Sequence, residues 1–403
     1  MKKATFSIDK LWDYNLFLIA LFPVLPRGVE SLLMLFFFVF SSIIFVKKKE
    51  YKIKKEEAYK VILLSGVFIL YTIGGLYSNN SDESVKFMIR TAPLLMFPLS
   101  IGILAKGKID KTKLKIILKL YIISLVIALL ATHLYLYIST TDLSKWEYRL
   151  AFEKLTDIHG TYFSLWLAFG VFILFTQLFN ANKKTSVFSS IIICYFIYWQ
   201  FTIGARLPFA TTILLVISFL IFKIKNKHFK ILTIVVISAV FFIFIVNQKK
   251  IDFSLPKGDY HLQHKTMTSE QIREGIYYCS FNLIQEKWLF GYGIGDVNDQ
   301  LSACYKKEID SNVYELMFYN AHNQYIQMML SSGIIGLFIF IVSILAAIRH
   351  SYKKKRKLYL FFNLLLTICF LTENILSRHD GVLFYAFFNS IFMFYSEVKK
   401  TEQ

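Results

Sequence analysis

Residues 29–46 read VESLLMLFFFVFSSIIFV, and Lys47, Lys48 and Lys49 follow directly. A run of this length fits a bilayer, because about 20 apolar residues span its hydrocarbon core. The whole chain shares this character. Of its 403 residues, 56% are hydrophobic and only 18% are charged, against about 25% charged residues in soluble domains. We therefore predict an all-α integral membrane protein.

Comparable apolar runs recur along the chain and predict about twelve transmembrane helices. They lie near 11–25, 29–46, 61–77, 88–105, 116–138, 161–180, 186–203, 208–223, 229–247, 326–348, 358–372 and 382–396. We expect the first run to be retained as a helix, because the sequence LPRG at 25–28 offers no cleavage site of small residues. Three parts follow: nine helices in 1–247, a large loop with its adjoining motif in 248–325, and three helices with a tail in 326–403.

The net charge of +19 comes mainly from lysines that form short clusters between apolar runs. Clusters of this kind mark cytoplasmic loops of membrane proteins, so we expect no nucleic-acid partner. An even number of helices then places both termini on the cytoplasmic side. The large loop faces outward, because long loops are translocated largely regardless of their charge.

Arginine is distributed differently from lysine. With this topology only Arg349 and Arg356 lie inside. Six arginines fall on outward-facing segments, namely Arg27, Arg90, Arg149, Arg206, Arg273 and Arg378. Topology does not explain this difference, because both residue types satisfy the positive-inside rule. Guanidinium groups bind phosphate oxygens bidentately, so the set indicates an anionic, phosphorylated substrate. Interfacial snorkelling and ion pairs with Asp or Glu are the alternative.

The large loop carries Arg273 and then the sequence WLFGYGIGD at 288–296. Its glycines lack the strand, helix and soluble βαβ unit of a nucleotide-binding fingerprint. They form either a plain tight turn or a turn whose N–H groups face an anion. On the second interpretation, Gly293 and Gly295 are candidates for binding a diphosphate or glycan.

His322 stands in NAHNQY at 320–325, where the loop rejoins an apolar run. A neutral imidazole there could take a proton from a hydroxyl, although a helix-start role is the simpler interpretation. Tyr325 in the same motif is a candidate for substrate binding. His261 and His264 have no further Cys or His to complete a zinc site, so we expect no metal.

Two short polar sequences separate the last two apolar runs: Glu373-Asn374, and Arg378 with His379 and Asp380. They could form an ion pair that closes an outer cavity, or they could contact substrate. Arg378 and Arg90 are therefore candidates for binding a diphosphate or glycan.

Together these motifs resemble the O-antigen ligase and O-antigen polymerase superfamily. The resemblance rests on Arg273 in a large outer loop and on GAR at 204–206, FGYGIGD at 290–296, HNQY at 322–325, GIIGL at 333–337, TENILSR at 372–378 and HGTY at 159–162. One departure is Gly160, where a proline often follows the histidine in the family, and this weakens any role for His159.

The resemblance implies a GT-C-type glycosyltransferase in the bacterial inner membrane, with its active face in the periplasm. Such enzymes take a glycan from undecaprenyl diphosphate. A ligase passes it to the lipid A–core of lipopolysaccharide, and a polymerase passes it to another lipid-linked repeat unit. The family's pattern includes no metal, cofactor or nucleotide sugar. We expect the ligase activity, with the polymerase as the alternative.

The resemblance also assigns roles. Arg206 and Arg273 match the family's essential arginines, which implies contact with the diphosphate. His322 matches its essential histidine, which implies activation or orientation of the acceptor hydroxyl. We expect a single displacement that inverts the anomeric centre. Cys279 and Cys304 flank the glycine motif on the oxidising side, so we predict a disulfide between them.

A transporter or flippase of lipid-linked saccharides is the competing function from another class. Twelve helices suit it equally well. Transporters are often built from paired halves with broken helices, however, and the chain shows no matching halves. A membrane sensor is a weaker alternative, because no signalling domain is evident.

Overall fold

The computed structural model describes residues 7–48, 53–139, 145–178, 182–223, 269–309, 313–316 and 318–396. Within these ranges the regular structure is helical, apart from one isolated bridge between Asp110 and Ser396. The apolar run predicted at 229–247, the start of the large loop at 248–268, and thus His261 and His264, lie outside the described residues.

The described apolar runs coincide with helices. The elements are α1 (Ile8–Ile19), η1 (Phe22–Val24), α2 (Arg27–Lys47), α3 (Lys55–Tyr77), α4 (Ser81–Thr91), α5 (Pro93–Leu99), η2 (Ser100–Leu104), α6 (Lys111–Ser139), α7 (Lys145–Thr156), α8 (Gly160–Leu178), α9 (Lys183–Ile203), α10 (Arg206–Lys223), α12 (Ser269–Glu286), α13 (Val297–Glu308), α14 (Val313–Leu316), α15 (Gln324–Lys353), α16 (Lys357–Cys369), η3 (Ile375–Ser377) and α17 (His379–Phe394).

Seven spans among the described residues are long and apolar enough to cross a membrane. They are Arg27–Lys47, Lys55–Tyr77, Ser81–Leu104, Lys111–Ile138, Gly160–Leu178, Lys183–Ile203 and Gln324–Lys353. α10 and α16 are apolar but shorter. The all-α class is therefore confirmed for the described residues, and the candidate spans agree with an integral membrane protein. The total of twelve helices remains a prediction.

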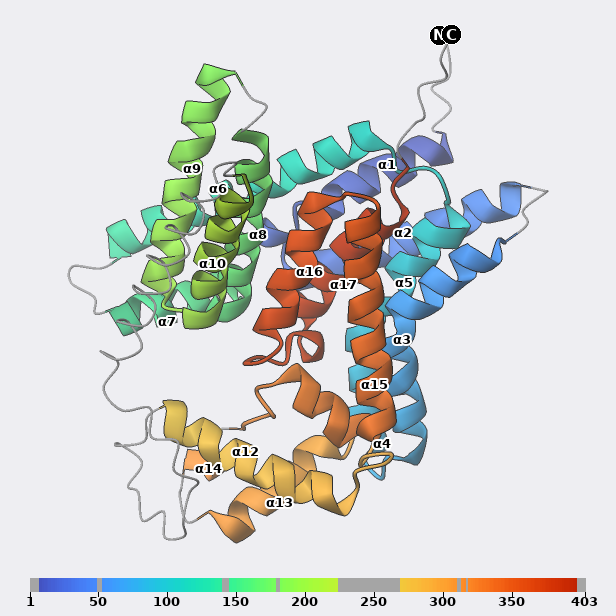
Figure 1. Ribbon diagram of the computed structural model, residues 1–403, viewed down its shortest axis with the longest axis vertical. Coiled ribbons are helices and arrows are strands. Elements are labelled where there is room, and N and C mark those ends of the chain that lie inside the picture. The colour runs from blue at the N-terminus through green and yellow to red at the C-terminus, as the bar shows by residue number, and fades with distance from the viewer. Residues whose placement is uncertain are drawn as a thin grey trace.

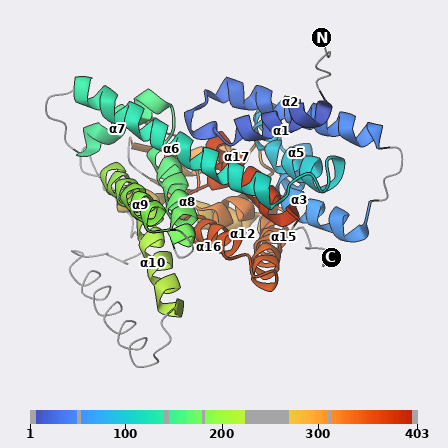
Figure 2. The same cartoon turned by 90° about the horizontal axis from the view of Figure 1, so that it is seen from above.

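α17 forms the buried centre of the bundle, with α3, α6, α8 and α16 around it (Figure 2). All of its residues from Asp380 to Met393 are buried. The Phe384 and Phe388 rings pack against Phe169 of α8 at centroid distances of 5.7 and 4.8 Å. A helix that is apolar on all sides is stable only in such surroundings. α17 thereby fixes the position of the turn that precedes it.

The bundle has two opposite faces (Figure 1). At the first, called the terminal face, Lys108 pairs with Asp9, and the Ser396 N–H donates to the Ile109 carbonyl at 3.0 Å. At the second, called the lobe face, α12, α13 and α14 cover the bundle end. These three helices, which we call the lobe, belong to the large loop predicted from the sequence.

A segment that precedes α13, residues 288–296, fastens the lobe to the bundle. Its Trp288 carbonyl accepts a hydrogen bond from the Ile334 N–H at 2.8 Å. α15 is kinked beside it at Gly333, where φ is 62° and ψ is −163°. At the other end of the segment, buried Asp296 accepts hydrogen bonds from the N–H groups of Asn79 and Asn80 at 2.9 and 2.7 Å.

Candidate functional site

The turn between α16 and α17 places a buried carboxylate at the lobe face. Glu373 is only 5% exposed, and Asn374 beside it is fully buried. The Asn374 side chain accepts from the Asn323 N–H at 2.7 Å and donates to Gln327 Oε1 at 3.0 Å. These bonds hold the turn against the start of α15. Two motifs that are far apart in the sequence, at 322–325 and 372–378, therefore meet.

His322 lies against Glu373. Its Nδ1 is 3.7 Å from Glu373 Oε2, which is an ion-pair distance that exceeds a hydrogen bond. The His322 N–H donates to Asn320 Oδ1 at 3.0 Å. The backbone of His322 is left-handed, with φ of 43°, a conformation that costs a non-glycine residue about 1–3 kcal/mol and occurs often at functional sites. Its side chain is 25% exposed, so the imidazole contacts both Glu373 and the exterior.

Glu373 is a carboxylate at neutral pH. Burial raises the pKa of Glu373, but His322, followed by His159 and Arg378, outweighs burial and brings that pKa below its usual range. The Tyr162 hydroxyl also donates to Glu373 Oε1 at 3.4 Å. A carboxylate held beside an imidazole stabilises the imidazolium that forms when the ring takes a proton. The pair can therefore act on a hydroxyl nucleophile.

A second histidine, His159, also lies near Glu373. Burial lowers the pKa of His159, against opposing effects of Glu153 and Glu373 that raise it. The ring is therefore neutral at neutral pH. Its Nε2 lies 3.4 Å from Arg149 Nη2 and its Nδ1 lies 3.4 Å from the Thr161 N–H, so His159 is held at the start of α8.

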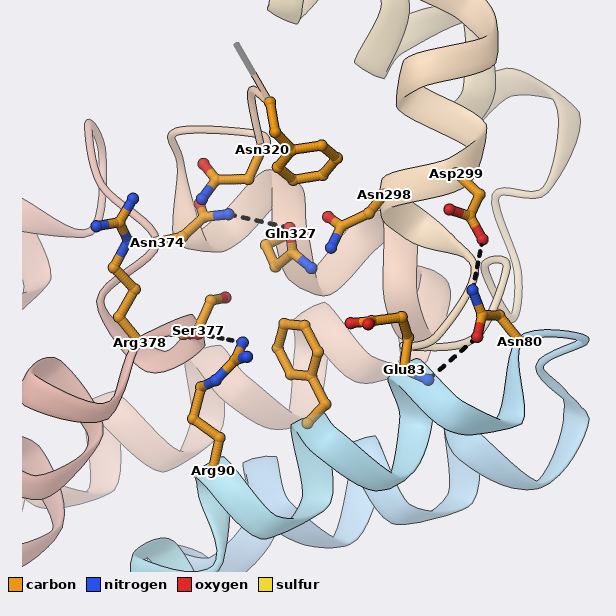
Figure 3. A pocket seen from close by; sticks show the side chains of 12 residues that line it. Asn80, Glu83, Arg90, Asn298, Asp299, Asn320, Gln327, Asn374, Ser377 and Arg378 are labelled. Atoms are coloured by element: carbon orange, nitrogen blue, oxygen red, sulfur yellow. Dashed lines mark hydrogen bonds between the residues drawn. The ribbon is translucent and has the colours of Figure 1, made fainter. Parts of the chain in front are cut away.

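A cavity of about 520 Å³ adjoins this turn. Its lining is polar, and it consists of Asn80, Glu83, Phe87, Arg90, Asn298, Asp299, Phe318, Asn320, Gln327, Asn374, Ser377 and Arg378. Figure 3 shows the two arginines at one end, Glu83 and Asp299 at the other, and amide side chains between them. The volume falls within the roughly 300–1,000 Å³ of small-molecule sites. One end of the cavity is positively charged and the other is negatively charged.

The two arginines of the cavity are held differently. Arg90 donates to the Ser377 carbonyl at 3.1 Å, and its guanidinium lies 5.0 Å from the Phe87 ring centroid. Arg378 is exposed, and within the described ranges its side chain makes no hydrogen bond or ion pair. Arg378 is therefore available to an anion, while Arg90 is already fixed in position.

Arg273 and Arg206 do not line the cavity. Arg273 lies one turn before Tyr277 on α12. Burial raises the pKa of Tyr277, with a lowering effect of Arg273 and a smaller raising effect of Glu373. Tyr277 is thus the residue that both Arg273 and Glu373 influence. Arg206 is exposed at the first residue of α10, at the same end of the bundle as the beginning of α8 (Figure 1).

Tyr325 points away from the cavity. Its hydroxyl donates to the Thr367 carbonyl at 2.9 Å, and its ring lies 5.7 Å from that of Phe340. Tyr325 therefore packs α15 against α16. We assign it to the helix packing near the site and not to substrate contact.

The N–H groups of the loop glycines Gly293 and Gly295 donate hydrogen bonds to other parts of the chain. The Gly293 N–H donates to the Ser331 carbonyl and the Gly295 N–H to Ser78 Oγ, both at 3.1 Å. A Cβ at either glycine would collide with α3 or the start of α4. Of the two interpretations open in the sequence, this arrangement matches the tight turn that brings two backbones together.

Among the described residues, Arg27 and Arg149 form ion pairs. Arg27 contacts Asp380 at 3.1 Å and Asp157 at 2.9 Å. Arg149 contacts Glu153 at 2.9 Å. Both arginines therefore follow the ion-pair alternative. Arg27 links the start of α2 to Asp157 and to the first turn of α17, whereas Arg149 pairs within α7.

A disulfide joins Cys279 of α12 to Cys304 of α13. Cys279 is fully buried in a small apolar core with Ile276, Leu301 and Tyr305. The two lobe helices are therefore linked both covalently and by packing. Within the described ranges, no group of three His, Cys, Asp or Glu side chains is placed to hold a metal ion.

We compared the amino-acid sequence with models of known protein families. Residues 164–341 match the family model described as O-Antigen ligase. Over this segment, which is less than half of the chain, the sequence is similar to the O-antigen ligase and polymerase superfamily. The matched segment contains Arg206, Arg273 and His322, whereas Glu373 and Arg378 follow it. The resemblance stated from the sequence is thus confirmed. No curated protein matches the chain.

Glu373 is the site residue whose partner the sequence did not reveal. Sequence reasoning offered an ion pair or a substrate contact for it, without naming His322. The available signal was a carboxylate placed directly after an apolar helix, where an ionised group needs a partner. Asn320 and Gln327 were also missed, because single amides carry no motif.

Proposed function

We propose that this chain is a ligase-type glycosyltransferase. It transfers a glycan from undecaprenyl diphosphate to the lipid A–core of lipopolysaccharide. The observation that carries the proposal is the contact of His322 with ionised Glu373, next to a cavity lined by Arg90 and Arg378. The superfamily match supplies the reaction class.

In the proposed reaction, an acceptor hydroxyl oxygen attacks the anomeric carbon of the donor, and the bond from that carbon to the diphosphate breaks. His322 takes the hydroxyl proton, and Glu373 stabilises the imidazolium. The bonding electrons pass to the diphosphate oxygen. Arg90 and Arg378, which line the cavity, stabilise the negative charge that develops there. Arg206 and Arg273 lie outside the cavity lining, and only the resemblance to the family assigns them to the diphosphate. A single displacement of this kind inverts the anomeric centre.

The cavity fits a donor of this chemistry. Its arginine end suits a diphosphate, because guanidinium groups bind phosphate oxygens bidentately. Its amide side chains, including Asn298, Asn320 and Gln327, offer donors and acceptors to sugar hydroxyls. We therefore place the diphosphate near Arg90 and Arg378, and the first sugars toward Asn80.

The proposed location is the bacterial inner membrane, with the lobe face in the periplasm. The lysine clusters at 47–49, 106–119 and 353–357 would then lie in the cytoplasm, as the positive-inside rule requires. The disulfide between Cys279 and Cys304 would lie in an oxidising compartment. Its partners are the lipid-linked glycan, the glycan acceptor and the membrane lipid.

Cells that carry His322→Ala or Arg273→Ala test the proposed function against transport. We expect loss of glycan transfer, with lipid-linked donor accumulating in the outer leaflet of the inner membrane. The control is Arg349→Ala, because Arg349 lies on α15 at the terminal face. Donor trapped in the cytoplasmic leaflet would contradict the transferase and indicate a flippase.

The choice of acceptor separates ligase from polymerase. Purified protein receives the lipid-linked donor together with either lipopolysaccharide core or a second lipid-linked repeat unit. We expect product on the core. Product formed only from repeat units would identify a polymerase and overturn the ligase assignment.

A further inference from the structure

The lobe carries large apolar side chains on its surface. Trp288, Phe290 and Phe281 are 56%, 61% and 56% exposed, and Leu289 and Tyr278 are each 39% exposed. Tyr278 and Phe281 lie on α12, and Trp288, Leu289 and Phe290 follow after the end of that helix. Soluble surfaces rarely gather so many apolar groups unless the groups meet a partner.

The 288–290 segment is held at the end of one candidate membrane span, α3, and beside the kink of another, α15. The Trp288 carbonyl accepts from the Ile334 N–H at 2.8 Å. The Phe290 carbonyl accepts from the Tyr77 hydroxyl at 2.6 Å. Tyr77 is the last residue of α3, and Ile334 follows the kink of α15. The backbone of the segment is therefore fixed to both helices.

The exposed side chains continue an apolar surface that runs along these helices. On α3, Ile73 and Leu76 are 51% and 83% exposed, and on α15, Ile335 and Phe338 are 42% and 66% exposed. Both helices are long and apolar enough to cross a membrane, so these side chains face the lipid. The 288–290 segment, which is hydrogen-bonded to both helices, thus adjoins their lipid-facing surface.

Polar residues border the segment on its lobe side. Gln285, Glu286 and Lys287 precede Trp288 and are exposed. Aromatic residues next to charged ones are typical of the interface between hydrocarbon and water, where tryptophan and tyrosine are enriched. This order places Trp288 at the depth of the lipid headgroups and the upper acyl chains.

We propose that Trp288, Leu289 and Phe290, together with Phe281, insert into the bilayer on the lobe side. The occupant of this surface is lipid. The insertion anchors the lobe at a second place besides its covalent links to the bundle. It holds the end of α12 at the membrane surface, so that a lipid-linked substrate can reach the cavity without leaving the bilayer.

Tryptophan fluorescence tests this inference without reference to activity. The protein is reconstituted in vesicles of phosphatidylcholine with bromine at shallow or deep acyl positions. The contribution of Trp288 is the difference between wild type and Trp288→Phe. We expect shallow bromines to quench this contribution by half or more, and aqueous iodide to leave it nearly unchanged.

A matched control places a tryptophan on the water-facing side of the same lobe. Lys307 on α13 has a side chain that is 82% exposed, so Lys307→Trp in the Trp288→Phe background should be quenched by iodide and not by bromolipid. Trp288 quenching that follows the iodide pattern would overturn the inference. Trp288 shielded from both quenchers would also overturn it, because a protein partner or a second copy would then cover the surface.

Discussion

The contact between His322 and Glu373 gains its full strength only when the histidine is charged. Two unit charges about 4 Å apart attract by about 1 kcal/mol in water and about 4 kcal/mol at the effective dielectric near a protein surface. The attraction therefore stabilises the state in which His322 holds the acceptor's proton. Glu373 is a positioning residue, because it acts through His322 and not on the reacting atoms.

Glu373→Gln should lower kcat for glycan transfer about 100-fold and leave KM for the donor nearly unchanged. The amide keeps the size of the side chain but removes the charge that stabilises the imidazolium. Initial rates with purified protein measure both constants. Glu308→Gln on the lobe surface serves as the control. A change in KM alone would show that Glu373 contacts substrate.

The same substitution should alter stability in a pH-dependent way. The pKa of Glu373 is lowered in the folded protein from its usual value of 4.5, so the carboxylate stabilises the fold above pH 4.5. This contribution disappears as pH falls through the lowered pKa. The Tm difference between wild type and Glu373→Gln should therefore be largest at pH 6–7 and shrink below about pH 4.5. The other charged groups at the site, His322, His159 and Arg378, are present in both proteins, so their own titration affects both Tm values. A Tm difference that grows as the pH falls would contradict the lowered pKa of Glu373.

Sequence reasoning found several site residues and could not pair them. Arg90 and Arg378 were predicted from the distribution of arginine, and both line the cavity. The partnership of His322 with Glu373 depends on α16 and α17 returning the chain to the start of α15, and no local pattern contains that information. Tyr325 looked equivalent to His322 in the motif, but a helix turns neighbouring side chains to different sides.

At the scale of helices, the apolar runs predicted the described helices well and missed their interruptions. The run at 88–105 contains Pro93 and Pro98, and the structure divides it among α4, α5 and η2. α7 (Lys145–Thr156) was not predicted as a helix, because polar and charged residues interrupt its apolar pattern. Burial against its neighbours, and not hydropathy, stabilises a helix of this kind.

Gly333→Ala should destabilise the junction between the lobe and α15 by about 1–3 kcal/mol. Gly333 has φ of 62° and ψ of −163°, a region open essentially to glycine. A Cβ there would also collide with the Leu289 carbonyl. Thermal unfolding in detergent measures the loss. Gly28→Ala on α2 is the control, since no atom lies within 4 Å of its Cβ, and equal Tm values for both variants would contradict the account.

For the whole molecule, the ion pairs at the two faces involve different residues. Lys106 pairs with Glu57, and Lys108 with Asp9, at the terminal face. At the lobe face, Arg27 pairs with Asp380 in the first turn of α17, and Arg90 donates to the Ser377 carbonyl just before that helix. Which face is periplasmic remains a prediction. The bias of Lys and Arg sets the orientation when the protein inserts into the membrane, and the fold alone does not show the outcome.

Loss of the disulfide should loosen the lobe as a unit. Cys279 and Cys304 are 25 residues apart, and a loop of this length is worth about 3 kcal/mol by the loop-entropy account. The double variant Cys279→Ser, Cys304→Ser should show faster amide exchange in α12 and α13 and a lower Tm. Cys194→Ser, at an exposed free cysteine, is the control. Unchanged exchange in α12 and α13 would show that packing alone holds the lobe.

The most direct test of the central claim is glycan transfer by purified protein reconstituted in vesicles. The substrates are a radiolabelled undecaprenyl-diphosphate glycan and lipopolysaccharide core. We predict transfer by wild type, a loss of at least 100-fold in His322→Ala, and a cooperative thermal transition of that variant that shows it is folded. Transfer by His322→Ala at the wild-type rate would contradict the proposal that this histidine, held by Glu373 at the lobe face, activates the acceptor.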